Sequence, residues 1–223
     1  MRIAKNYIHH HLGLGDHIVC NGLVRRLIDR MSGRVTMACK PHNVPSVKML
    51  YQGSGLQIDP CVDDKSAESA YKNFDTVYRV GFEKCHLPKW EESFYDQFHM
   101  DYEERFSNFS IKRSPYRESN LLGQLHIAEP YAIASTQTSA GKNKITLDTN
   151  LRVIEICPMT DSLFDWILVI EKSTEVHMVD SAPFQLVKQI GYKKRKVFYD
   201  TRPVDGTRTD YTFEDNSWEK ITI

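Results

Sequence analysis

The chain has 223 residues, of which 41% are hydrophobic and 11% aromatic, so it is long enough for one large domain or two smaller ones. Lysine plus arginine and aspartate plus glutamate each number 29, which gives a formal net charge of zero. This balance supplies no global field that would attract nucleic acid or an anionic membrane. No apolar run approaches the roughly 20 residues that span a bilayer, and no apolar signal region follows the N-terminus. We therefore expect a cytoplasmic protein with no nucleic-acid partner and no transmembrane segment.

The cysteines are odd in number, and no two of them have the close spacing of a zinc knuckle or a redox pair. They are Cys20, Cys39, Cys61, Cys85 and Cys157. Several lie in apolar stretches, where cysteine behaves as a small hydrophobic residue. We expect five reduced thiols and no disulfide framework.

The first half of the chain alternates between strand and helix patterns. In chain order we expect a strand at 3–9, a glycine-rich turn at 12–16, an amphipathic helix ending at 32–33, a strand at 34–39, a helix from 45, an edge strand at 56–58 and a strand at 75–80. Between Lys89 and Phe109, aromatic residues at helical spacing predict helix packed on a core. A strand, a helix and a returning strand make a βαβ unit, which implies a parallel sheet.

The stretch from Lys112 to Arg117 has charge, a proline and no periodicity, as a linker would. After it we expect strands at 131–134, 152–157, 175–179 and 196–199, a polar loop at 135–144, helices after Ser162 and over 184–190, and a polar tail anchored by Trp218. The predicted fold class is α/β, with two small Rossmann-like lobes facing a cleft, the first over residues 1–113 and the second over 118–223. Open α/β sheets bind ligands at the carboxyl ends of their strands.

The turn after the first strand is the strongest candidate site. Gly13 and Gly15 allow a ligand to approach the backbone closely, and free N–H groups of the following helix face the same place. The dinucleotide fingerprint needs a third glycine where this chain has Ile18. Asp16, beside an exposed His17, is suited to accept a proton from a substrate hydroxyl. Alternatively Asp16 simply caps the helix, and the spacing is compatible with both roles.

The run from His11 to His17, H-L-G-L-G-D-H, resembles the first-strand loop of glycosyltransferase-B proteins, in particular the G-[IL]-G-D loop of the heptosyltransferase family. Asn21-Gly22-Leu23 extends the likeness to small glycosyltransferase-like proteins, as do the stretches 94–106 and 175–181. The resemblance implies that Asp16 is the base that deprotonates the acceptor hydroxyl. It also implies that the first lobe takes the acceptor, that the second takes a nucleotide-sugar donor, and that transfer inverts the anomeric centre.

The heptosyltransferase pattern V-D-[ST]-G-x-x-H places backbone amides on the donor diphosphate, and Val179-Asp180-Ser181 is similar to its beginning. Ala182 replaces the family's glycine and Gln185 its histidine, which puts donor binding and activity in doubt. From the residues alone, a helix N-terminus after a strand binds anions, whereas Asp180 suits a ribose or sugar hydroxyl. The alternative for Ser181 is an ordinary N-cap.

Further donor contacts are expected from the polar loop after the first strand of the second lobe. Ser135, Thr136 and Lys142 could touch phosphate oxygens, although the loop lacks P-loop spacing and equally fits a solvated, flexible segment. Three arginines are candidate clamps for a diphosphate, each with a surface role as the alternative: Arg105, Arg113 and Arg202.

The triplet His9-His10-His11 does not predict a metal site, because neighbours in an extended segment point to opposite faces. We expect no metal and no cofactor besides the nucleotide sugar as co-substrate. The leading hypothesis is a metal-independent glycosyltransferase acting on a glycan or other hydroxyl acceptor. The alternative is a nucleotide- or sugar-binding module that has lost the chemistry. The missing dinucleotide and G-x-S-x-G signatures argue against a dehydrogenase or hydrolase.

Overall fold

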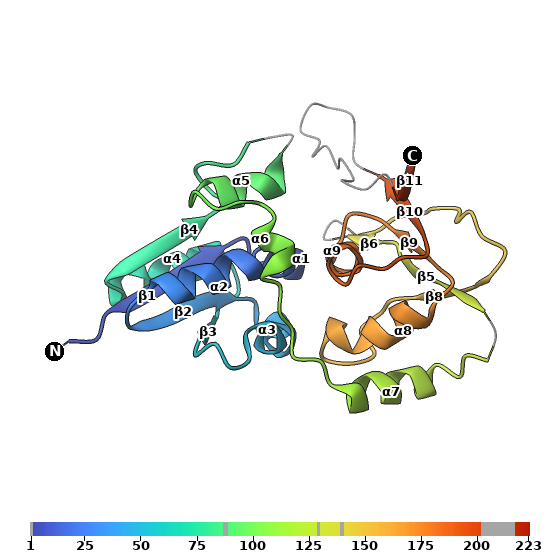
Figure 1. The fold of residues 1–223 in the computed structure, drawn as a ribbon, viewed down its shortest axis with the longest axis horizontal. Helices are drawn as coiled ribbons and strands as arrows, with labels where there is room; N and C mark the ends of the chain where they lie inside the picture. Colours follow the sequence, from blue (N-terminus) through green and yellow to red (C-terminus); the bar gives the residue numbers. More distant parts are fainter. Residues whose placement is uncertain (1, 87–88, 129, 139–140, 202–216) are drawn as a thin grey trace. The chain divides into compact units, whose positions relative to one another are not determined.

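The computed structural model describes residues 2–86, 89–128, 130–138, 141–201 and 217–223. The chain divides into two compact units, Met1–Lys112 and Arg113–Ile223, which we call the N-terminal and C-terminal lobes. Each lobe contains a parallel β-sheet with helical connections (Figure 1). The predicted α/β class with two Rossmann-like lobes is confirmed.

The N-terminal sheet has the strand order β3-β2-β1-β4, and all its neighbours are parallel. Its strands are β1 (Lys5–His10), β2 (Arg34–Cys39), β3 (Gln57–Pro60) and β4 (Thr76–Val80). The connections contain α1 (Leu14–Val19), α2 (Asn21–Arg30), α3 (Val44–Tyr51) and α4 (Asp64–Ala70), and α5 (Trp90–Asp96) and α6 (Glu104–Ser107) follow β4. The sequence predicts β2 with its observed bounds, and β3 lies at the edge as expected.

The C-terminal sheet has the order β11-β10-β9-β5-β8, again with parallel neighbours. Its strands are β5 (Tyr131–Ser135), β8 (Arg152–Glu155), β9 (Glu175–Met178), β10 (Arg195–Asp200) and β11 (Trp218–Thr222). The helices are α7 (Pro115–Gln124), α8 (Ile167–Lys172) and α9 (Ala182–Gln189), and a 3-10 turn at Leu163–Trp166 precedes α8. Ser162 caps that turn, as its type and position predict.

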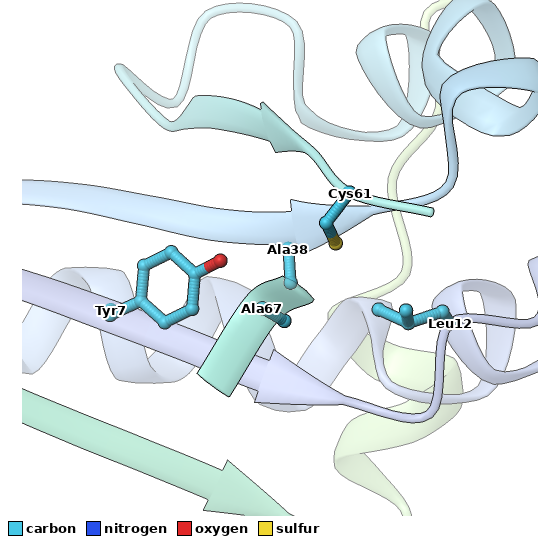
Figure 2. Packing of buried hydrophobic residues seen from close by; sticks show 5 residues of the cluster. All are labelled: Tyr7, Leu12, Ala38, Cys61 and Ala67. Atoms are coloured by element: carbon cyan, nitrogen blue, oxygen red, sulfur yellow. The ribbon is translucent and has the colours of Figure 1, made fainter. Parts of the chain in front are cut away.

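Each sheet packs against apolar side chains from its own connections. In the N-terminal lobe, Figure 2 shows a cluster of five buried residues that joins β1, the turn after it, β2, the segment after β3, and α4: Tyr7, Leu12, Ala38, Cys61 and Ala67. The Tyr7 hydroxyl donates to Asp59 at 2.7 Å, so this buried polar group is satisfied. The Tyr7 ring also packs against the rings of Tyr71 and Phe74, with centroids 5.9 and 4.5 Å away, so the connection after α4 covers this face of the sheet.

Several elements differ from the sequence predictions. The aromatic stretch 89–109 forms two short helices, because the chain leaves α5 through a tight turn in which His99 has a φ of 51°. Pro115, placed in the linker, is instead the first residue of α7, where its missing N–H costs nothing. The tail contains a strand, β11, whose Trp218 packs edge-on against Phe184.

Two polar segments that carry little apolar patterning also form regular structure. The loop expected at 135–144 contains a small antiparallel pair, β6 (Gln137–Thr138) and β7 (Gly141–Lys142). Helix α4 is not predicted, because Ala67 is its only buried residue. The Asp63 carboxylate caps it, accepting from the Ser66 N–H at 2.7 Å.

Candidate functional sites at the two switch points

Each sheet has one point at which the strand order reverses, and ligands of open α/β sheets bind beside the carboxyl ends of the strands at such a point. In the N-terminal lobe the reversal lies between β1 and β4. The His11 ring bridges it, because its Nε2–H donates to the Gly81 carbonyl just beyond β4 at 2.8 Å. The loop His11–Gly13 therefore begins at the position where the fold most often places a ligand.

Asp16 lies in the first turn of α1, which begins immediately after this loop. Gly13 is the N-cap residue with extended φ and ψ of −69° and 144°, and no side chain caps the helix. A Cβ atom on Gly13 would lie 2.6 Å from Asp16 Oδ2, so glycine is required for the carboxylate to lie over the turn. Gly15 is already inside α1. The turn thus holds a half-buried carboxylate at the carboxyl edge of the sheet.

Asp16 lies near two thiols and contributes to their pKa shifts. Burial first, and then the Asp16 charge, raise the pKa of Cys20 well above its usual range. Burial also raises the pKa of Cys85, and Asp16 adds to the shift. All five cysteines are free, as predicted. Asp16 is therefore a negative group beside neutral thiols, in a setting where a carboxylate could accept a proton from a bound hydroxyl.

His17 is not the exposed residue that the sequence predicts. Its side chain is fully buried, and neither ring nitrogen has a hydrogen-bond partner among the described residues. The ring packs edge-on against that of His10, with centroids 4.3 Å apart. Burial, reinforced by His10, lowers the pKa of His17 well below its usual value. A neutral imidazole enclosed in this way is poorly placed to assist proton transfer, so its role is packing beneath the Asp16 turn.

The histidine triplet divides as strand geometry requires. His9 faces α4 and contacts the Tyr71 hydroxyl and Asp64, at 2.6 and 3.0 Å. His10 points to the opposite face, toward His17. His11 leaves the strand and packs between Phe82 and Trp90. No group of three or more histidine, cysteine, aspartate or glutamate side chains within the described ranges could hold a metal ion.

In the C-terminal lobe the strand order reverses between β5 and β9. Ser135 ends β5, and Ser181 follows β9 as the N-cap of α9. Their hydroxyl oxygens lie 3.3 Å apart across the switch point. The structure thus brings together two of the predicted donor-binding residues, which are separated by 46 positions in the chain.

Thr136 follows Ser135, and its polar groups are engaged within the protein. Its N–H and its Oγ1 hydroxyl both donate to Glu155 Oε1, at 2.9 and 2.7 Å. Its carbonyl accepts from the backbone N–H and the side-chain amide of Asn143. This part of the loop is therefore ordered by specific bonds. Lys142, in β7, is exposed, and in the described part of the chain no side-chain hydrogen bond or ion pair ties it to the switch point.

The first turn of α9 offers fewer free donors than a helix N-terminus usually does. Pro183 has no N–H, and the N–H groups of Phe184 and Gln185 donate to the side chain and the carbonyl of Ser181. Ala182 is the first residue of α9, so its N–H has no acceptor within the helix. Asp180, half-buried in the preceding loop, adds negative charge there. Ser181 is thus an N-cap, which is the alternative that the sequence analysis gives to an anion-binding role.

The three arginines considered as diphosphate clamps have other positions. Arg105 is fully buried and pairs with Glu91 inside the N-terminal lobe, so it is not a clamp. Arg113 pairs with Glu118 and Glu171. Arg202 lies outside the described residues.

The motif Asn21-Gly22 has a packing role. The Asn21 amide donates to the Leu50 carbonyl, and its oxygen accepts from the Ser110 N–H. A Cβ on Gly22 would collide with the Glu104 carbonyl of α6, so glycine lets α2 and α6 approach. Both residues hold the helices around the Asp16 turn.

The sequence did not single out Glu155 or His11 as site residues. Each bonds to the residue that directly follows a neighbouring strand of the sheet, Thr136 for Glu155 and Gly81 for His11. The sequence feature that could have identified Glu155 as a site residue is its position as a carboxylate at the end of a strand.

Protein-family models give no match to this sequence, and no curated protein matches it significantly. Solved structures do match. The E. coli ADP-heptose LPS heptosyltransferase II aligns with a TM-score of 0.58 and 9% identity over 97% of this chain and 90% of that one. The family 9 glycosyl transferase of Veillonella parvula aligns with a TM-score of 0.56 and 9% identity over 100% of this chain and 88% of that one.

A third match is TibC, the iron-containing dodecameric glycosyltransferase of enterotoxigenic E. coli, with a TM-score of 0.56 and 13% identity over 90% of this chain. The chain spans 60% of the length of TibC. No helix within the described residues has the length and apolar character needed to cross a membrane. The shared feature is the fold, a glycosyltransferase-B-like pair of Rossmann-like lobes.

Proposed function

We propose that this chain is a glycosyltransferase that moves a sugar from a nucleotide-diphosphate donor to a hydroxyl acceptor. The observation that carries the proposal is the position of Asp16, a half-buried carboxylate in the first turn after β1, at the switch point of a lobe with the heptosyltransferase fold. The acceptor is assigned to the N-terminal lobe and the donor nucleotide to the C-terminal lobe.

In the proposed reaction, Asp16 takes the proton of the acceptor hydroxyl as its oxygen bonds to the anomeric carbon. The bond between that carbon and the phosphate oxygen breaks, and the nucleoside diphosphate leaves with the electron pair. A single displacement of this kind inverts the anomeric centre. In the C-terminal lobe, Ser135, Ser181 and the Ala182 N–H are the groups assigned to the donor, with Asp180 assigned to one of its hydroxyls.

The test is a transfer assay with nucleotide sugars, followed by substitution of the base. ADP-heptose is the first donor to try, because TibC has been crystallised with ADP-D-β-D-heptose. Asp16→Asn keeps the size of the side chain and removes the proton acceptor, so turnover should fall by about 10²–10⁴-fold. Asp29→Asn, which removes an exposed carboxylate from α2 of the same lobe, is the matched control and should keep normal turnover.

A second candidate function is a binding module that holds a nucleotide or sugar without transfer. The observation that favours it is the engagement of Thr136 by Glu155, together with the few free donors at α9. Saturable nucleotide binding without turnover of any donor would support the binding module, and the loss of turnover in Asp16→Asn would support the transferase.

A further inference from the structure

The switch point of the C-terminal lobe contains an unusual bonding pattern, in which one carboxylate oxygen accepts from two donors of a single residue. Glu155 Oε1 receives both the N–H and the hydroxyl of Thr136, at 2.9 and 2.7 Å. Glu155 is the last residue of β8, and Thr136 follows the adjacent parallel strand β5. A backbone N–H and a hydroxyl that converge on one oxygen form the arrangement that also binds a phosphoryl oxygen.

Two other donors around this point are also in use. The Ser181 hydroxyl donates to the Val179 carbonyl at 2.9 Å, and the Phe184 N–H donates back to Ser181 Oγ. A diphosphate accepts hydrogen bonds and carries negative charge, so it needs free donors and no carboxylate in contact with it. As built, the Thr136 end of the site satisfies neither requirement.

We propose that Glu155 is an internal competitor of the diphosphate, occupying the Thr136 donors until an anion displaces it. The inference rests on the proposed function in placing the donor nucleotide in this lobe. Displacement breaks two charge-assisted hydrogen bonds and moves a carboxylate away from the incoming anion. Glu155 therefore weakens binding of the diphosphate group and has no effect on binding of the uncharged nucleoside.

The experiment compares Glu155→Gln with the unmodified protein by calorimetric titration of inorganic pyrophosphate, ADP and adenosine. Glutamine keeps the shape and an acceptor oxygen for Thr136 but removes the charge, so the fold should be retained and the melting temperature checks this. We expect pyrophosphate and ADP to bind about five- to twentyfold more tightly to Glu155→Gln, since a charge-assisted hydrogen bond becomes a neutral one. Adenosine affinity should stay the same.

Glu171→Gln is the matched control. Glu171 lies in the last turn of α8 and pairs with Arg113. The substitution removes one carboxylate from the same lobe and should leave all three affinities unchanged. Adding Thr136→Val to Glu155→Gln should reverse part of the gain, because the freed hydroxyl is then absent.

Three results would overturn the inference: equal pyrophosphate affinity in both proteins, weaker binding to Glu155→Gln, or no pyrophosphate binding to either. Weaker ADP and adenosine binding to Glu155→Gln would instead show that Glu155 accepts a ribose hydroxyl. The transfer assay separates this inference from the proposed function. Tighter pyrophosphate binding to Glu155→Gln without any sugar transfer would support the competitor role and reject the transferase. Sugar transfer with unchanged pyrophosphate affinity would support the transferase and reject the competitor role.

Discussion

The hydroxyl oxygens of Ser135 and Ser181 lie 3.3 Å apart, joining the end of β5 to the N-cap of α9. Neither residue is near the other in sequence, and they meet because β5 and β9 are adjacent parallel strands. The contact places one helix terminus and one strand end at the reversal of strand order. It therefore links the stability of α9 to the geometry of the proposed donor site.

Ser181→Ala should lower the free energy of unfolding by about 1 kcal/mol, the usual value of an N-cap serine. It should also weaken ADP binding, because the Ser181 hydroxyl lies at the switch point. Urea unfolding and calorimetric titration measure the two effects.

Ser162→Ala is the control for the cap alone. Ser162 also accepts from a backbone N–H, that of Phe164 at 3.2 Å, but it caps the turn before α8. Both variants should lose similar stability, and only Ser181→Ala should lose affinity. Equal ADP affinity in the two variants would remove Ser181 from the donor site.

Arg105→Met should destabilise the N-terminal lobe by about 3–5 kcal/mol, because it leaves the nearly buried Glu91 carboxylate without its partner. Tyr102 also donates to that carboxylate, at 2.7 Å, and cannot neutralise it. The measurement is urea unfolding of the single variant and of the double variant Arg105→Met, Glu91→Leu. The double variant should recover most of the loss, since it removes both buried charges. Normal stability with reduced nucleotide affinity would instead indicate the clamp role.

The parts of the fold that could be predicted from sequence are those with strong local patterns. The strand at 34–39 is mostly buried and follows a glycine that lies just after a helix, and Ser162 precedes an apolar helical run. Helix α4 and strand β11 could not be predicted from the sequence pattern, because each buries little apolar surface of its own. Their stability comes from a cap in α4 and from pairing with β10 in β11, and neither contribution has a periodic signature.

Residues of the candidate site could be proposed from sequence where a local motif contains them, whereas contacts between distant residues could not. The turn at Gly13–Asp16 is local, and its place after the first strand follows from the pattern. The pairing of Thr136 with Glu155 spans 19 positions and depends on the register of β5 with β8. The burial of His17 could not be predicted because histidine occurs both at surfaces and in cores, and its ring lies against that of His10 inside the lobe.

Gly22→Ala and Gly123→Ala should have effects of opposite sign. A methyl group on Gly22 collides with the Glu104 carbonyl, so α2 and α6 must separate, at a cost of about 1–3 kcal/mol. Nothing lies within 4 Å of the same position on Gly123 in α7, where alanine should add about 0.5–1 kcal/mol through its higher helix propensity. Thermal unfolding measures both. A neutral Gly22→Ala would show that the motif Asn21-Gly22 does not act through helix packing.

The free energy of unfolding should decrease as the pH is lowered below about 6.5, because the buried side chains of His10 and His17 stay neutral in the folded protein. Unfolded histidine titrates near 6.5, whereas burial lowers the pKa of His10 to about 4 and that of His17 further below its usual value. Between these values the unfolded chain binds protons that the folded chain does not, so unfolding becomes more favourable as the pH falls. The stabilising contribution of the neutral pair is complete above pH 6.5, and the part due to His10 alone, about 3 kcal/mol, is lost by pH 4.

His17→Phe replaces a ring with no hydrogen bond among the described residues by an apolar one, so it should preserve stability at pH 7.5 and flatten the decline between pH 6.5 and 4. His42→Gln, at an exposed position in the same lobe, should leave the decline as it is. Urea unfolding at pH 7.5, 6 and 5 tests all three proteins, and an equally steep decline in His17→Phe would show that the pair is not the source of the acid sensitivity.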